Sequence, residues 1–160
     1  MDEKRHLWGV DSTMTGYTHI RKAHCMFGWD WGPMLPDMGI WRSVSLIVPG
    51  AGRILDVYYS QKHTDNKVTL KALLHIENHG CKKAMVEISD PQGNITAKAD
   101  ISLEESAEYY ETELVINDPQ LWWVNGYGEQ PLYICAVTLY DENDACTDKN
   151  TQRIGLRTLT

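Results

Sequence analysis

An all-β fold is predicted for most of this 160-residue chain, and two features of the sequence carry that prediction. From residue 53 onward, apolar and polar residues alternate with a period of two, which is the pattern of strands that turn one face to a core. Turn-forming residues separate the alternating stretches, and none of the stretches has the period of a helix. We therefore expect an antiparallel β-sandwich over residues 53–160.

Seven strands are expected within that sandwich. The stretch 67–76 shows the pattern most clearly, because every even position is apolar and Leu73 is the one apolar residue at an odd position. Turn residues at 90–94 join two strands into a hairpin, and the run DENDAC at 141–146 forms the turn before the last strand. Seven short strands joined by turns are typical of an immunoglobulin-like β-sandwich. The expected strands span residues 54–60, 67–76, 84–88, 95–103, 110–116, 132–140 and 151–159.

Residues 1–48 follow a different pattern. The stretches 17–27 and 40–48 can form strands, but the glycine- and proline-containing stretch 28–39 between them is expected to be a long loop. Two strand-like segments are too few to close a core of their own. We therefore expect residues 1–48 to be the C-terminal tail of a larger domain, and residues 49–52 to form the boundary with the sandwich.

Charge and composition exclude several classes of function. The chain has 22 Asp and Glu residues against 15 Lys and Arg residues, so it lacks the basic stripe that holds a phosphate backbone, and no nucleic-acid partner is expected. No apolar run approaches the roughly 20 residues of a membrane span. The sequence begins without the apolar core of a secretory signal, which predicts a cytoplasmic protein.

No metal site and no cofactor are predicted. The four cysteines are widely spaced and form no Cys-x-x-Cys pair. His75, His79 and Cys81 have a spacing that superficially suits zinc, but no fourth ligand lies nearby in the sequence. Solvated hairpin residues are the better interpretation of these three side chains.

The run Gly28-Trp29-Asp30-Trp31-Gly32 carries the candidate binding residues. An indole face stacks on the apolar C–H face of a sugar ring, and a carboxylate accepts hydrogen bonds from sugar hydroxyls. Trp29, Asp30 and Trp31 together therefore favour a sugar site. The alternative interpretation stays open at this point: the tryptophans can fill a seam between domains while Asp30 caps the turn.

Three segments resemble the β-mannosidases of glycoside hydrolase family 2. The run HIRKAHCMFGWDWGP at 19–33, followed by GIWR at 39–42, is similar to the end of their sugar-binding domain. The run LWWVNGYGEQPLY at 121–133 is similar to a segment of their immunoglobulin-like domain. The run IGLRT at 154–158 resembles the strand that leads into their catalytic barrel. The segments occur in the family's order and include both ends of the chain.

The resemblance implies an enzyme with a jelly-roll domain, an immunoglobulin-like sandwich and a (β/α)8 barrel that carries two catalytic glutamates. Such a barrel typically takes about 250 residues, more than the whole chain. The chain is therefore expected to be a noncatalytic fragment of a retaining β-mannosidase that removes terminal β-mannosyl residues. It is expected to contain no catalytic residue and to pack on the catalytic barrel and on the rest of the jelly roll.

The resemblance also assigns roles to the Trp-Asp-Trp run. Asp30 would bind hydroxyls of the β-mannoside in the −1 subsite, and Trp29 would wall the pocket. For Trp31 two interpretations stay open, a second wall of the pocket or packing in a seam between domains. Two positions depart from the family pattern: Met34 replaces a residue that is more often basic, and Val124 replaces a residue that is more often Pro.

Two alternative functions remain. The chain can be a free carbohydrate-binding module that uses Trp29, Asp30 and Trp31 as its platform. It can also be an immunoglobulin-like interaction domain without a ligand.

Overall fold

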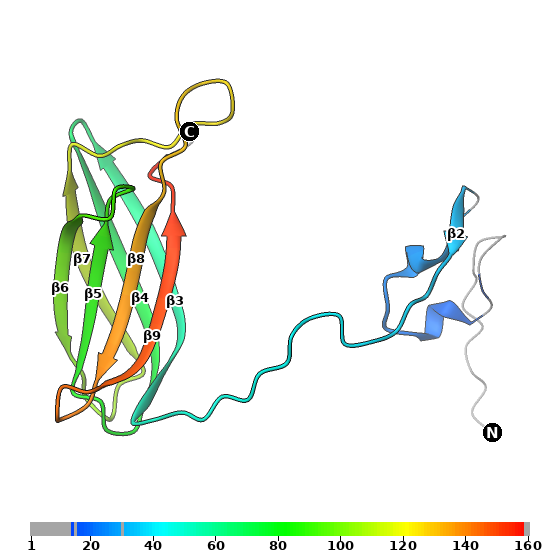
Figure 1. Ribbon diagram of the computed structural model, residues 1–160, viewed down its shortest axis with the longest axis horizontal. Coiled ribbons are helices and arrows are strands. Elements are labelled where there is room, and N and C mark those ends of the chain that lie inside the picture. Colours follow the sequence, from blue (N-terminus) through cyan, green and yellow to red (C-terminus); the bar gives the residue numbers. More distant parts are fainter. Residues whose placement is uncertain (1–13, 15, 30, 159–160) are drawn as a thin grey trace. The chain divides into compact units, whose positions relative to one another are not determined.

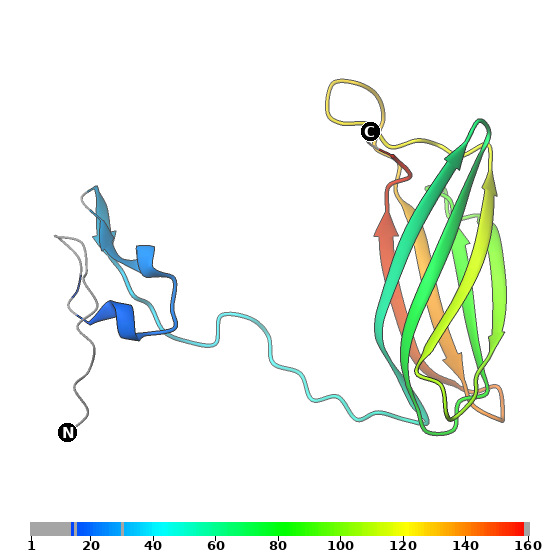
Figure 2. The ribbon, with the colours of Figure 1, turned by 180° about the vertical axis from the view of Figure 1, so that it is seen from behind.

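The computed structural model describes residues 14, 16–29 and 31–158, shown in Figures 1 and 2. The chain divides between residues 46 and 47 into two compact units. Among the described residues, the helices are two 3-10 turns of three residues each, η1 (Tyr17–His19) and η2 (His24–Met26), so none is long enough to cross a membrane.

The second unit is an antiparallel β-sandwich of seven strands in two sheets, as predicted. One sheet has the order β3-β4-β7 and the other has the order β6-β5-β8-β9, and the two face each other in Figure 1. All neighbouring strands are antiparallel. The strands are β3 (Gly52–Thr64), β4 (Lys67–Asn78), β5 (Lys83–Ser89), β6 (Ile95–Ser102), β7 (Tyr109–Asn117), β8 (Tyr133–Tyr140) and β9 (Cys146–Ile154).

The core lies between the two sheets and is built from the alternating apolar residues. On β4 every even position from 68 to 76 is at most 1% exposed, whereas the odd positions face outward. Burying one large aliphatic side chain stabilises a fold by about 1.5–3 kcal/mol. The largest fully buried side chains are Leu70, Leu74, Ile76, Ile88, Ile116, Leu139 and Leu156.

Side-chain hydrogen bonds join β3 to β9 along the open side of the sandwich. Each strand is the outermost of its sheet, so a row of its backbone groups has no neighbouring strand to pair with. Side-chain hydrogen bonds take the place of the missing backbone hydrogen bonds between these two strands. Three bonds, which we call the β3–β9 rungs, run from the Ile54 amide to Asp148 Oδ2 (2.8 Å), from Gln152 Nε2 to the Val57 carbonyl (3.0 Å) and from Gln61 Nε2 to the carbonyl of Gly155, the residue that follows β9 (3.0 Å).

The expected bounds of the last strand were wrong, because the strand begins directly after the turn that precedes it. Asp141 Oδ1 accepts hydrogen bonds from the amides of Asn143 (2.8 Å) and Ala145 (2.9 Å), and Asp144 adopts a left-handed φ of 56°. The turn is complete at residue 145. Pairing with β8 therefore begins at Cys146, so that β9 covers 146–154 rather than 151–159.

The expected strands of the first unit were also wrong. Residues 17–26 contain the turns η1 and η2, and the stretch 40–48 has no regular structure. The expected long loop instead contains a short hairpin of β1 (Phe27–Trp29) and β2 (Gly32–Met34). A strand needs a neighbour for its backbone groups, and within the described part of the chain no strand pairs with residues 17–26 or 40–48.

We expect the sandwich to fold without the first unit. Its buried core and both of its sheets lie within residues 52–156. A truncated chain of residues 53–160 should give a dispersed amide spectrum. Its unfolding midpoint should lie within about 4 °C of the full chain's, the shift that ~1 kcal/mol produces in a domain of this size. A collapsed amide spectrum would show that residues 1–52 are needed for folding.

Candidate functional site

The turn between β1 and β2 carries both tryptophans of the Trp-Asp-Trp run. Phe27 pairs with Met34 and Trp29 pairs with Gly32, so β1 and β2 form a short antiparallel hairpin. Trp29 is thus the last residue of β1, and Trp31 lies within the turn. Asp30, the third predicted site residue, lies outside the described residues.

The two indole rings lie side by side and are open to solvent. Their centroids are 6.0 Å apart with an interplanar angle of 58°, within the usual range for aromatic pairs. Trp29 is 43% exposed and Trp31 is 81% exposed. The structure therefore brings two of the three predicted site residues together, and both present an aromatic face on which a ligand ring can stack.

Rings behind the turn hold the hairpin in place. Phe27 stacks on Tyr17 at a centroid distance of 5.9 Å, and the edge of His24 meets Tyr17 at 5.1 Å. Between Phe27 and Trp29 the chain passes through Gly28 at a φ of 106°, which a residue with a side chain rarely adopts. Gly28 therefore lets the chain place Phe27 in the small core and Trp29 at the turn.

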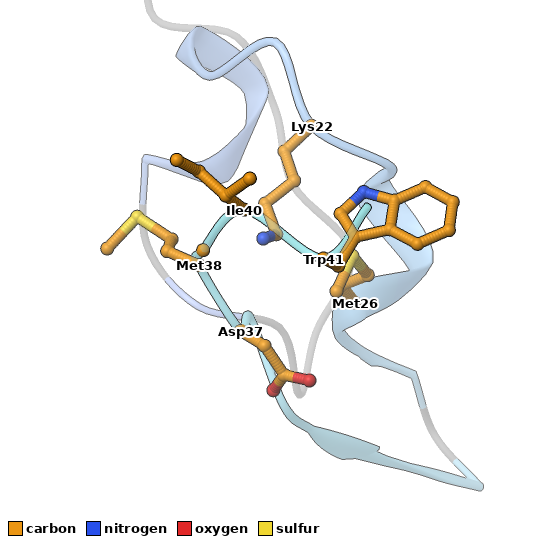
Figure 3. Close-up of a pocket in the computed structure, with 7 residues that line it drawn as sticks. Lys22, Met26, Asp37, Met38, Ile40 and Trp41 are labelled. Atoms are coloured by element: carbon orange, nitrogen blue, oxygen red, sulfur yellow. The ribbon is translucent and has the colours of Figure 1, made fainter. Parts of the chain in front are cut away.

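A hollow of about 620 Å³ in the first unit was not predicted from the sequence (Figure 3). Its lining combines an ammonium, a carboxylate and an indole, and Met38, Ile40 and Trp41 in that lining are exposed to solvent. The Arg42 guanidinium lies 4.1 Å from the centroid of the Trp41 ring. The sequence did not indicate this hollow, because its lining residues come from segments on both sides of the hairpin. They are Lys22, Met26, Asp37, Met38, Gly39, Ile40 and Trp41.

In the second unit, the segments 121–133 and 154–158 meet at the end of the sandwich where β9 ends. The Trp122 amide donates to the Leu156 carbonyl (3.1 Å), and the Arg157 guanidinium lies 3.7 Å from the centroid of the Trp123 ring. Leu156 is fully buried. The contact between these two segments therefore fixes the path of the chain after β9.

Gln61 strengthens that contact from the opposite sheet. Its Oε1 accepts hydrogen bonds from the Arg157 amide (3.0 Å) and lies 3.0 Å from His63 Nε2. Burial, and after it the positive charge of Arg157, lower the pKa of His63, so the neutral ring is favoured there. These residues bind and orient the backbone of the segment that follows β9.

The three residues with zinc-like spacing do not converge. His75 stacks on Tyr109 with a centroid distance of 4.4 Å, and His79 lies 3.2 Å from Glu77 Oε1. Cys81 is buried, and its Sγ lies 3.2 Å from Thr147 Oγ1. In residues 14, 16–29 and 31–158, no group of three or more His, Cys, Asp and Glu side chains is arranged to hold a metal ion.

Both units match glycosidase family models. The model of glycosyl hydrolases family 2 matches residues 52–157, and a model described as glycosyl hydrolase 2 galactose-binding domain-like matches residues 1–42.

The curated relatives include Beta-mannosidase B of Emericella nidulans, which is 31% identical over 157 residues, and Beta-mannosidase B of Aspergillus terreus, which is 33% identical over 161 residues. These alignments cover 96% and 98% of this chain. The chain spans about 18% of the length of either relative.

Solved structures with a similar fold include β-glucuronidases. The enzyme from Ruminococcus gnavus in complex with D-glucaro 1,5-lactone has a TM-score of 0.56 at 19% identity, over 69% of this chain and 16% of that one. The enzyme from Lactobacillus rhamnosus has a TM-score of 0.57 at 23% identity, over 71% of this chain and 17% of that one. The similarity between this chain and these two enzymes concerns the fold alone.

Proposed function

Because the chain belongs to family 2 of the glycosyl hydrolases, we propose that it is part of a retaining β-mannosidase that removes terminal β-mannosyl residues. The two relatives named Beta-mannosidase B that are described above support this substrate, since they are 31% and 33% identical over nearly the whole chain. The β-glucuronidases align over less of the chain and at no more than 23% identity.

The exposed tryptophan pair at the tip of the β1–β2 hairpin is the observation that carries the proposal. Trp29 and Trp31 present aromatic faces 6.0 Å apart, on either side of position 30. We assign Trp29 to the wall of the −1 subsite, Trp31 to a second wall, and Asp30 to the sugar hydroxyls. A carboxylate there would accept charge-assisted hydrogen bonds, which are stronger than neutral ones.

In this proposal the chain is a scaffold that supplies part of a subsite. Retaining hydrolysis needs two carboxyl groups about 5–5.5 Å apart, and the family resemblance assigns both to a barrel of about 250 residues. The exposed apolar residues of the stretch 40–48, among them Trp41, Val44 and Leu46, support a further partner. They would be covered by the rest of the jelly-roll domain.

Substrate preference in the complete enzyme tests the proposal. The whole reading frame that encodes this chain should be expressed and assayed on aryl β-mannoside and aryl β-glucuronide. We expect kcat/KM to favour the mannoside by at least about 100-fold, because a site built for particular hydroxyl groups discriminates strongly. The isolated 160-residue chain should turn over neither substrate. Preference for the glucuronide, or turnover by the isolated chain, would refute the proposal.

A further inference from the structure

The loop between β7 and β8 exposes a group of hydrophobic side chains. Trp123, Val124 and Tyr127 are 36%, 45% and 77% exposed. The loop lies at the end of the sandwich where β8 begins and β9 ends, because Tyr133 pairs with Ile154. Figures 1 and 2 show it in yellow, projecting from that end. We call residues 122–129 the Trp123 loop.

The Trp123 loop has a defined conformation of its own. The Trp123 amide donates to the Glu129 carbonyl (2.9 Å), and the Tyr127 amide donates to the Val124 carbonyl (3.0 Å). A Cβ atom at Gly128 would lie 2.8 Å from the Trp123 ring, so the backbone packs directly against the indole. A loop that is already ordered loses less conformational entropy when its side chains are covered.

Both tryptophans of the loop hold the segment through which the chain leaves the sandwich. A Cβ atom at Gly155 would lie 2.8 Å from Trp122 Cγ, and the Arg157 guanidinium lies over the Trp123 ring. Because Leu156 between these positions is fully buried, the direction of the segment is fixed relative to the loop. Any part of a protein that follows residue 158 therefore starts beside the Trp123 loop.

The small size of this surface favours a partner in the same chain. The exposed parts of the three side chains amount to on the order of 300 Å², whereas a stable interface between separate proteins buries about 800 Å² on each partner. A tethered domain needs less area, because its linker keeps it at a high effective concentration. The chain enters the sandwich at Gly52, at the end opposite to the loop, and leaves it beside the loop.

We propose that the Trp123 loop is the surface on which the part of the complete enzyme that follows residue 158 packs. The proposal rests on the function proposed above, in which this chain is one part of a longer enzyme. The two Beta-mannosidase B relatives are long enough to contain such a part, since this chain spans about 18% of either. Tyr127 is the main anchor, because it is the most exposed of the three side chains.

Hydroxyl-radical labelling read by mass spectrometry tests the proposal on the 160-residue chain and on the complete enzyme. Tyr127 should be labelled readily in the 160-residue chain, because it is 77% exposed. In the complete enzyme its labelling should be at least about fivefold slower, because the centre of an interface excludes water. Tyr58, which is 63% exposed on β3, is the internal reference and should be labelled equally in both proteins. Equal labelling of Tyr127 in the two proteins would overturn the proposal.

A variant of the complete enzyme tests the anchor. Tyr127→Ala should raise the labelling of Trp123 toward its rate in the 160-residue chain. Tyr58→Ala is the matched control, since it removes a tyrosine of similar exposure from another part of the sandwich, and it should leave Trp123 protected. A rise of the same size in both variants would also overturn the proposal, because the contact would then not depend on the loop.

Protection of Tyr127 already in the 160-residue chain would assign the loop to another partner and overturn the proposal. Protection that grows with protein concentration would identify a second copy, and protection independent of concentration would identify the first unit. Because the labelling needs no substrate, its failure is separate from that of the proposed function. An enzyme that prefers the glucuronide but protects Tyr127 would refute that function and support the packing surface, and a mannoside-selective enzyme with an exposed Tyr127 would do the reverse.

Discussion

Replacing Asp30 with alanine in the complete enzyme is expected to lower kcat/KM for a β-mannoside by about 10- to 150-fold. Charge-assisted hydrogen bonds from sugar hydroxyls to a carboxylate are worth roughly 1.5–3 kcal/mol, which corresponds to that loss. If these bonds strengthen as the ring distorts toward the transition state, kcat falls as well as the affinity for substrate. The melting temperature should change little, because a carboxylate that contacts a ligand is usually not part of a core.

Kinetics and thermal unfolding measured on the same sample separate a sugar contact from a turn cap. If Asp30 only caps the turn, Asp30→Ala costs about 1 kcal/mol of stability and leaves kcat/KM of the folded enzyme unchanged. Asp65→Ala is the matched control, since it removes an exposed carboxylate from the turn between β3 and β4. Unchanged kinetics with a lowered melting temperature would remove Asp30 from the sugar site.

Leu74→Ala is expected to lower the free energy of unfolding by about 2–5 kcal/mol, whereas Leu73→Ala should cost less than about 1 kcal/mol. The two leucines are adjacent on β4, but Leu74 is fully buried between the sheets and Leu73 faces solvent. Removing Leu74 leaves a cavity that the neighbouring strands fill only in part. Removing Leu73 leaves none.

Urea unfolding of the 160-residue chain, followed by far-ultraviolet circular dichroism, measures both changes. Leu73→Ala is the matched control, because it removes the same type of side chain from the neighbouring position of the same strand. A shift of β4 by one residue would exchange the faces of the two leucines. Equal costs for the two variants would therefore contradict the register between β4 and its neighbours.

The sandwich could be predicted from the sequence because a strand with one buried face must alternate. The pattern of 67–76 gave the position and the buried face of β4. The start of β9 could not be found in this way, because the edge strand alternates only weakly. Its first residue depends on the Asp141 turn, whose hydrogen bonds have no counterpart in a pattern of apolar residues.

The strand predictions for the first unit were wrong. A strand-like pattern of residues indicates a buried face, and that face is buried only where a neighbouring segment pairs with the strand. The stretch 40–48 has strand-like composition, yet in the described chain no other strand pairs with it. The candidate site was only partly predictable. The sequence identified Trp29 and Trp31 from their chemistry, but the hollow around Trp41 combines separate segments, and its geometry depends on the turns between them.

The β3–β9 rungs have a mechanical consequence. The numbering of their partners rises together along both strands, so β3 and β9 run in the same direction. The sandwich therefore begins at one end with Gly52 and finishes at the opposite end with Ile154 (Figures 1 and 2). Tension applied through the flanking segments pulls the two strands past each other. All three bonds then carry the load in parallel, and the sandwich resists extension as a stiff spacer rather than opening one bond at a time.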